Sequence, residues 1–309
     1  MYRYVLKRLL MLVPVILGVI LLIFVVMDLA PGDPALMIAS PDATEEELAE
    51  LRTNLGLDKG IAYRYVAYVK NMLHGNLGSS YISGRPVMDV YLERLPETLK
   101  LAVGAVFVAL IISIPLGIIA AVHQNTFKDS ASMVVALIGV SMPSFWLGLL
   151  LMLLFSLKLG WFPSGGTVGF KSIVLPSITM GLNLAAVMTR TTRSSMLDVL
   201  HSDYLRTARA KGVNEKKVIL KHAFKNALIP IITVFGSQFS YVLGGAVLVE
   251  TIFSYPGVGK MVVDAIGNRD IPSVTGGIVM TTIIVTCVNL VIDLLYAYVD
   301  PRIKGQYVK

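Results

Sequence analysis

The residues that most often carry catalysis or bind metals are scattered along this sequence of 309 residues. The histidines are His74, His123, His201 and His222, and no two of them stand at a metal-ligand spacing. No serine lies in a G-x-S-x-G motif, and Gly257–Lys260 lacks the G-x-x-x-x-G-K-[ST] spacing of a phosphate-binding loop. The single cysteine, Cys287, lies in an apolar run, so we expect a buried and inert thiol. The sequence therefore predicts a chain that is not an enzyme and that binds no metal or cofactor itself.

The strongest functional signal is a basic segment, residues 203–230, with the sequence DYLRTARAKGVNEKKVILKHAFKNALIP. Its residue types predict two short helices joined by a turn. Ser202 or Asp203 can cap the first helix, because a short side-chain oxygen accepts a hydrogen bond from a free backbone N–H. Gly212 is placed to end that helix, since glycine adopts the left-handed conformation at low cost. Asn214 can then cap the second helix.

One face of the first predicted helix carries small residues, with Leu205, Ala208 and Gly212 at positions i, i+3 and i+7. Such a face lets another backbone approach closely, so we expect it to contact a soluble partner. The basic charge allows a second interpretation, adsorption to anionic lipid, which attracts each Lys or Arg near the surface by ~1 kcal/mol. The candidate contact residues are Asp203, Leu205, Arg206, Ala208, Arg209, Gly212, Lys216 and His222.

The composition indicates a membrane protein, because 55% of the residues are hydrophobic and the mean hydropathy is +0.72. A helix needs about 20 apolar residues to cross ~30 Å of hydrocarbon. Six runs meet this length: roughly 9–28, 98–122, 131–157, 173–192, 228–250 and 274–298. The sequence therefore predicts an all-α membrane protein with six transmembrane helices.

The charge distribution predicts the orientation of these spans. Residues 29–97 contain ten acidic and six basic residues, whereas residues 190–225 contain nine basic and three acidic ones. Because positive loops stay on the cytoplasmic side, residues 190–225 and both chain termini are expected inside. The net charge of +7 is explained in this way without a nucleic-acid partner.

The first apolar run is predicted to be a retained span rather than a cleaved signal peptide, because it is long and Asp28 occupies the cleavage region. The chain then divides into a first span (1–28), an external helical cap (29–97) and a five-span core (98–309), with a cytoplasmic loop at 194–227. Within the cap, Thr44 and Glu47 form a capping-box pattern that opens a helix to about residue 54, and a second helix is expected over residues 63–73.

Polar residues inside the spans suggest where solute passes. Gln238, Tyr241 and Gly245 form a stripe on the fifth span, which either lines a translocation path or bonds to a neighbouring helix. Glu250 is expected at the outer mouth, where it could meet a cationic peptide terminus. Pro143 lies within the third span, where a neighbouring helix must satisfy the carbonyl that it frees.

The sequence resembles the permease subunits of bacterial ABC importers, in the dipeptide, oligopeptide and nickel branch. The resemblance covers nearly the whole chain. Its motifs are LAPGDPA (29–35), GNLGSS (75–80), LPETLKL (95–101), MPSFWLG (142–148), LGWFPSGG (159–166), DYLRTARAKG (203–212), HAFKNALIP (222–230), GGAVLVETIFSYPGVG (244–259) and LLYAYVDPRI (294–303). In the "EAA" loop of this family, Gly212 takes the glycine position and Ala208 the second alanine, while Arg206 and Thr207 replace the acidic residue and the first alanine.

The resemblance implies a type I importer permease in the bacterial inner membrane. It implies four kinds of partner: a second homologous permease, two cytoplasmic ATPases that bind ATP and Mg²⁺, an external substrate-binding protein, and lipid. The loop would dock on an ATPase, and the substrate would be a di- or oligopeptide, with nickel, glutathione or another small conjugate as alternatives. An ion-coupled carrier is a rival class, but it would need ionisable residues at mid-bilayer, and the spans have few.

Overall fold

The computed structural model describes residues 2–40 and 42–299, so the last four residues of the motif LLYAYVDPRI lie outside the described part. Within that part the structure is helical apart from one isolated β-bridge between Ser79 and Pro86. The chain forms two compact units. The first comprises the described residues up to Thr98 together with Pro256–Leu290, and the second comprises Leu99–Tyr255 and the described residues from Val291.

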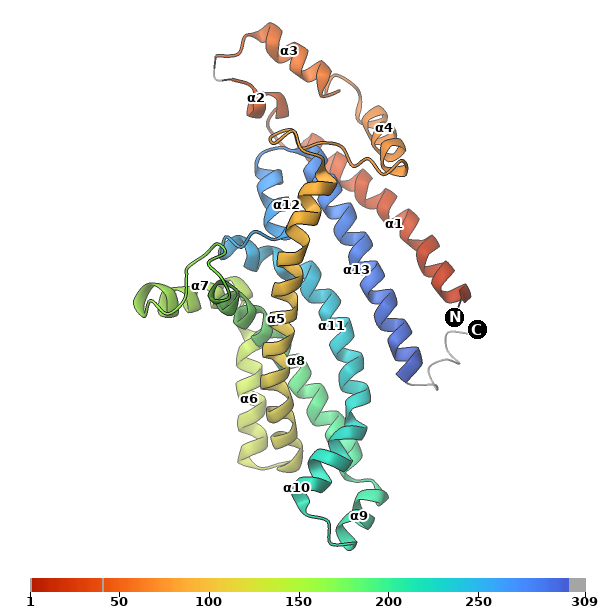
Figure 1. Cartoon of the computed structure of the whole chain (residues 1–309), viewed down its shortest axis with the longest axis vertical. Helices are drawn as coiled ribbons and strands as arrows, with labels where there is room; N and C mark the ends of the chain where they lie inside the picture. Colours follow the sequence, from red (N-terminus) through yellow and green to blue (C-terminus); the bar gives the residue numbers. More distant parts are fainter. Residues whose placement is uncertain (1, 41, 300–309) are drawn as a thin grey trace. The chain divides into compact units, whose positions relative to one another are not determined.

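The helices follow one another along the chain as shown in Figure 1. Those before the third predicted span are α1 (Tyr2–Leu29), α2 (Pro34–Ile38), α3 (Glu45–Asn54), α4 (Ile61–Leu73) and α5 (Val87–Val122). Those that follow are α6 (Phe127–Ser141), α7 (Ser144–Leu151), the π-helix η1 (Met152–Lys158), α8 (Lys171–Leu200), α9 (Asp203–Ala210), α10 (Glu215–Lys217), the π-helix η2 (Val218–Ala223), α11 (Phe224–Ile252), α12 (Val258–Gly267) and α13 (Ile271–Val299).

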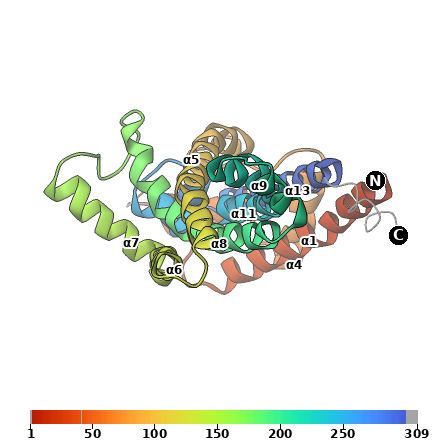
Figure 2. The ribbon, with the colours of Figure 1, turned by 90° about the horizontal axis from the view of Figure 1, so that it is seen from below.

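Five of these helices are long and apolar enough to cross a membrane, and a sixth span is present if the bent pair α6 and α7–η1 counts as one. The predicted third span, residues 131–157, was wrong in one respect, because it is not continuous. The chain leaves the helix at Met142, Pro143 precedes the first turn of α7, and the two parts meet at an angle of 98°. Proline lacks the N–H that would continue the hydrogen-bond ladder, so the new helix begins beside it. Figure 2 shows α7 directed away from the axis of α6.

In the first unit, α1 forms the core together with α4, α12 and α13. The buried side chains from α1 include Ile20 and Phe24, and the partly buried side chains of α4 pack against this cluster. The predicted capping box of α3 is confirmed, because the Thr44 hydroxyl accepts from the Glu47 N–H and the Glu47 carboxylate accepts from the Thr44 N–H. The second cap helix is confirmed as α4.

In the second unit, α8 packs against α6, α7 and α11, and small residues allow close approach at the helix crossings. A Cβ atom added at Gly139 of α6 would lie 2.6 Å from the carbonyl oxygen of Leu182 on α8. A Cβ atom at Gly117 of α5 would lie 2.5 Å from the side chain of Thr192 on α8. These contacts fix the position of α8, the helix that leads into the basic segment.

The thiol of Cys287 was expected to be buried, but this prediction was wrong, because the residue is exposed on the chain. Within the described part, the helix α13 has a face that the chain does not cover, and Cys287 lies on it. In an apolar helix, a thiol can lie on the surface of its own chain when lipid or another membrane subunit covers that surface.

Candidate coupling site

The basic segment forms a hairpin at one end of the second unit, beyond the ends of α5, α8 and α11 (Figure 1). Leu205 on α9 is fully buried, as are Val218 and Ala223 on η2, and α9 packs against η2. The Asn226 amide of α11 also donates to the hydroxyl of Tyr204, at 2.8 Å. These contacts attach α9 firmly to the long helix that follows it.

The end of α9 has the predicted form. Gly212 has a φ of 76°, the left-handed conformation that glycine adopts readily. The N–H of Gly212 donates to the carbonyl of Arg209, and the N–H of Val213 donates to the carbonyl of Ala208, which is the Schellman pattern. The prediction for the start of α9 was wrong, because the Ser202 hydroxyl donates backwards to the carbonyl of Val199 and makes no cap.

The segment after the turn is not a second short helix, so that prediction was also wrong. Asn214 does cap it, since its side-chain oxygen accepts from the Lys216 N–H at 2.9 Å. However, α10, η2 and α11 continue into one another, and the helical segment extends from Glu215 to Ile252. A helix that begins at the turn of the basic hairpin therefore continues as the fifth predicted span.

An ion pair closes the hairpin. Nη2 of Arg209 donates to Oε1 of Glu215 at 2.9 Å, and Nε of Arg209 donates to Oε2 of Glu215 at 3.2 Å. The hydrogen bond to this carboxylate raises the pKa of the Arg209 guanidinium above its usual value. The pair connects the end of α9 with the start of α10 across the turn.

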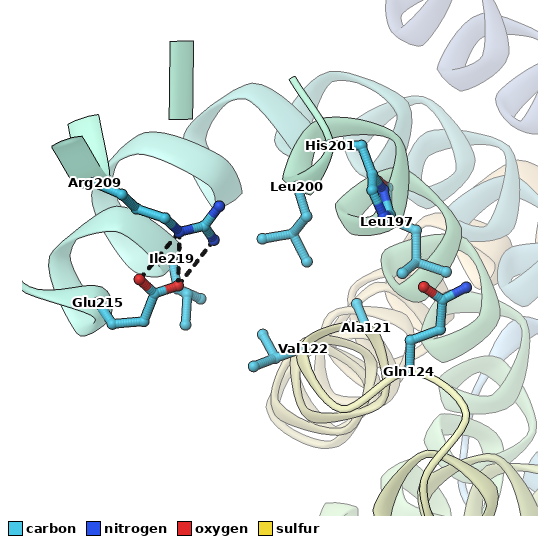
Figure 3. Close-up of a pocket in the computed structure, with 9 residues that line it drawn as sticks. All are labelled: Ala121, Val122, Gln124, Leu197, Leu200, His201, Arg209, Glu215 and Ile219. Carbon is cyan, nitrogen blue, oxygen red and sulfur yellow. Dashed lines mark hydrogen bonds and ion pairs between the residues drawn. The ribbon is translucent and has the colours of Figure 1, made fainter. Parts of the chain in front are cut away.

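Beside this ion pair is a cavity of about 270 Å³, drawn in Figure 3. Arg209, Glu215 and Ile219 lie on one side of it, and side chains from the ends of α5 and α8 lie on the other. Those side chains are Ala121, Val122, Gln124, Leu197, Leu200 and His201. The cavity leaves the inner surface of the hairpin incompletely packed against the helix ends.

The predicted contact residues do not all lie on the outer surface. Asp203, Arg206, Arg209, Gly212 and Lys216 are exposed. Ala208 and His222 are half-buried, and Leu205 is turned into the chain. Leu205, Ala208 and Gly212 therefore do not form one exposed face. The exposed surface consists of charged side chains and the turn at Gly212, and Leu205 packs on the inner side of α9.

The sequence reasoning missed an ion pair that holds the helices above the hairpin. Nε and Nη2 of Arg193 on α8 donate to the two carboxylate oxygens of Asp129 on α6, each at 2.7 Å. Asp129 is buried and also accepts from the N–H of Asn125. The only sequence signal is a single acidic residue after an apolar span and an arginine near the end of another, 64 positions later.

The candidate path residues lie on α11. Gln238 is half-buried, and Tyr241 and Gly245 are exposed, so this stripe faces away from the second unit's own helices. Glu250, expected at the outer mouth, is fully buried within the chain, so its carboxylate is not exposed to a peptide terminus in this structure. Across residues 2–40 and 42–299, no three His, Cys, Asp or Glu side chains come together as a metal site would require.

The structure is that of a helical membrane protein with several spans and a charged hairpin at the end of one helical unit. Solved structures with a similar fold are those described as "Inward facing conformations of the MetNI methionine ABC transporter: CY5 SeMet soak crystal form" and "Crystal structure of an amino acid ABC transporter with histidines". The first has a TM-score of 0.59 at 17% identity over 69% of this chain and 97% of that one. The second has a TM-score of 0.51 at 14% identity over 70% and 94%.

The sequence matches the family described as "Binding-protein-dependent transport system inner membrane component" over residues 113–305, and its N-terminal counterpart over residues 1–102. Similar curated proteins are the glutathione transport system permease proteins GsiC of Salmonella choleraesuis (strain SC-B67) and Escherichia coli (strain K12). Each is 43% identical over 304 residues, which covers 98% of this chain and 99% of the relative. The chain therefore belongs to this family, as a multi-pass inner-membrane permease subunit of an ABC importer, and the resemblance inferred from the motifs is confirmed.

Proposed function

We propose that this permease transports small peptides across the membrane and is driven by a cytoplasmic ATPase that binds the 203–225 hairpin. The observation that carries the coupling role is the combination of an exposed charged surface, a buried anchor at Leu205 on α9 and direct continuity into α11. A force applied to this hairpin reaches a membrane span without passing through a flexible linker.

The proposed assembly contains a second homologous permease, two ATPases and an external binding protein. ATP and Mg²⁺ would be bound by the ATPases, and this chain would contribute no catalytic group. Both chain termini and the hairpin would lie in the cytoplasm, and residues 29–97 would lie outside, as the charge distribution predicts. Closure of the ATPases would displace the hairpins, open the path outward, and let the binding protein deliver its substrate.

For the substrate we propose a small peptide, and glutathione is the first to test, because it is a tripeptide and the relatives at 43% identity are glutathione permeases. Nickel complexes and other small conjugates are the alternatives. Ligand screening of the binding protein that copurifies with the complex, by calorimetry with glutathione, dipeptides and nickel, identifies the class. Binding of none of these would contradict the substrate proposal and leave the coupling proposal intact.

The coupling role is tested by Gly212→Asp. The space around Gly212 is open, and aspartate tolerates the left-handed conformation better than most residues, so the variant should insert and fold normally. We expect ATP hydrolysis to continue while uptake falls at least tenfold, because the added carboxylate changes the docking surface.

Gly56→Asp is the matched control for this variant. Gly56 ends α3 in the same Schellman pattern, with a φ of 68° and open space at its Cβ position. It therefore carries the same backbone strain, on the side of the membrane opposite to the proposed ATPase contact. Equal uptake by both variants would show that the hairpin is not where the ATPase acts.

A further inference from the structure

The helix α4 has two apolar faces, and among the described residues only one of them is packed against the rest of the chain. Its inner face packs against the α1 cluster through Ile61, Tyr65, Tyr68, Val69 and Met72. On its other side, Tyr63, Val66, Lys70 and Leu73 are exposed. The spacing of three or four residues places these four side chains on one strip of the helix, which we call the α4 strip. Its three hydrophobic members are between 62% and 76% exposed.

The contacts between α4 and α1 show which part of α1 lies beside α4. Arg64 bonds to Asp28, which follows directly on the apolar part of α1. The Tyr65 hydroxyl donates to the carbonyl of Leu17 at 3.3 Å. Leu17 precedes Asp28 by 11 residues, or about 16 Å along a helix, which is about half the thickness of the hydrocarbon. The Tyr65 side chain of α4 therefore contacts α1 about 16 Å before the end of its apolar run.

Further contacts confirm an apolar setting for the inner face. The ring of Phe24 on α1 meets Tyr65 edge-on at 6.4 Å between centroids, and Tyr68 at 5.7 Å. The Tyr68 hydroxyl is buried without a hydrogen-bond partner among the described residues. The helix α4 thus lies along a span whose own exposed surface is apolar, including Leu22 and Val26.

From this geometry we propose that α4 is a membrane-interface helix and that the α4 strip lies in the lipid leaflet at the C-terminal end of α1. The surface that α1 leaves exposed is apolar, as is most of the strip, and the residue types of the strip suit the interface. Tyr63 has an apolar body with a polar tip, and Lys59 and Lys70 can extend their ammonium groups toward headgroups. The Lys59 ammonium already lies 5.4 Å from the centre of the Tyr63 ring. This proposal requires α1 to span the membrane and does not depend on the substrate or on ATPase coupling.

The test uses nitroxide labels on single cysteines in the full chain, carrying Cys287→Ser, in lipid nanodiscs with the subunits that copurify. Val66→Cys and Leu73→Cys probe the α4 strip. Leu22→Cys on α1 is the lipid reference, and Glu46→Cys on the exposed acidic helix α3 is the water reference. Accessibility to oxygen, which partitions into lipid, is compared with accessibility to a water-soluble nickel chelate.

We expect the strip labels to match Leu22, with oxygen accessibility several-fold above nickel accessibility. Labels that match Glu46 would overturn the proposal, and so would labels shielded from both reagents, which would mean that a protein partner covers the strip. Because a label could disturb local packing, a second measurement uses Tyr63→Trp in a Trp146→Phe, Trp161→Phe background. Quenching by lipids brominated near the headgroup is expected, and its absence would contradict lipid contact.

Discussion

The ion pair between Arg193 and Asp129 gives a prediction whose size follows from the structure. Arg193→Gln removes two charge-assisted hydrogen bonds of 2.7 Å and leaves the Asp129 carboxylate, only 8% exposed, with the N–H of Asn125. Breaking a fully buried pair costs about 3–5 kcal/mol. The Arg193 side chain is 26% exposed, so we lower the expected cost to about 2–4 kcal/mol, or roughly 4–10 °C in Tm.

The assay is thermal unfolding followed by intrinsic fluorescence in nanodiscs, with Arg85→Gln as the control. Arg85 and Glu93 form a pair of the same bidentate type, but their side chains are 49% and 58% exposed, so water screens the pair and its loss should shift the Tm much less. The double variant Arg193→Gln, Asp129→Asn should recover part of the loss, because it leaves no buried charge. Equal Tm shifts for Arg193→Gln and Arg85→Gln would refute the reasoning. So would a Tm shift of the double variant equal to the sum of the shifts of its two single variants.

Three further predictions concern other contacts. Gly139→Ala should destabilise the second unit by about 1–3 kcal/mol, measured as a lower Tm, because the added Cβ meets a backbone carbonyl. Gly18→Ala is the control, and it should be neutral or stabilising because the space around Gly18 is open. Leu205→Ala should loosen the hairpin through a cavity worth about 2–5 kcal/mol, seen as faster proteolysis between α9 and α10, while the exposed Arg206→Ala should leave the cleavage rate unchanged. Burial, with a contribution from Asp270, raises the pKa of Tyr81 to about 12. The stability contribution of the buried Tyr81 phenol is thus complete below pH 10 and lost as pH approaches 12. In a titration followed by phenolate absorbance, Tyr81→Phe should lack one of the tyrosines that ionise at high pH in the unmodified protein.

Local patterns in the sequence predicted local structure correctly. The capping box at Thr44, the turn at Gly212 and the cap at Asn214 depend on side chains within a few residues of the backbone that they bind. The apolar runs likewise predicted the spans, because the length of a run is set by the thickness of the bilayer.

The failures concern direction and distance. An apolar run does not report that the chain turns by 98° at Pro143, because the parts on both sides of the bend are apolar. The Asp129–Arg193 pair joins residues 64 positions apart, and Leu205 is buried by helices that a sequence pattern cannot place. Glu250 is polar and near a span end, so its burial could not be read from its type.

The continuous helix from Glu215 to Ile252 has a mechanical consequence. Its 38 residues correspond to about 57 Å, so a tilt of roughly 5° at the hairpin moves the far end by roughly 5 Å. A helix of this length therefore converts a small rotation at one end into a displacement at the other end that is comparable to the width of one amino-acid side chain. The sites at which it can bend are the wider turns of η2, the missing hydrogen bond at Pro230, and the small residues Gly236, Ser237, Gly244 and Gly245.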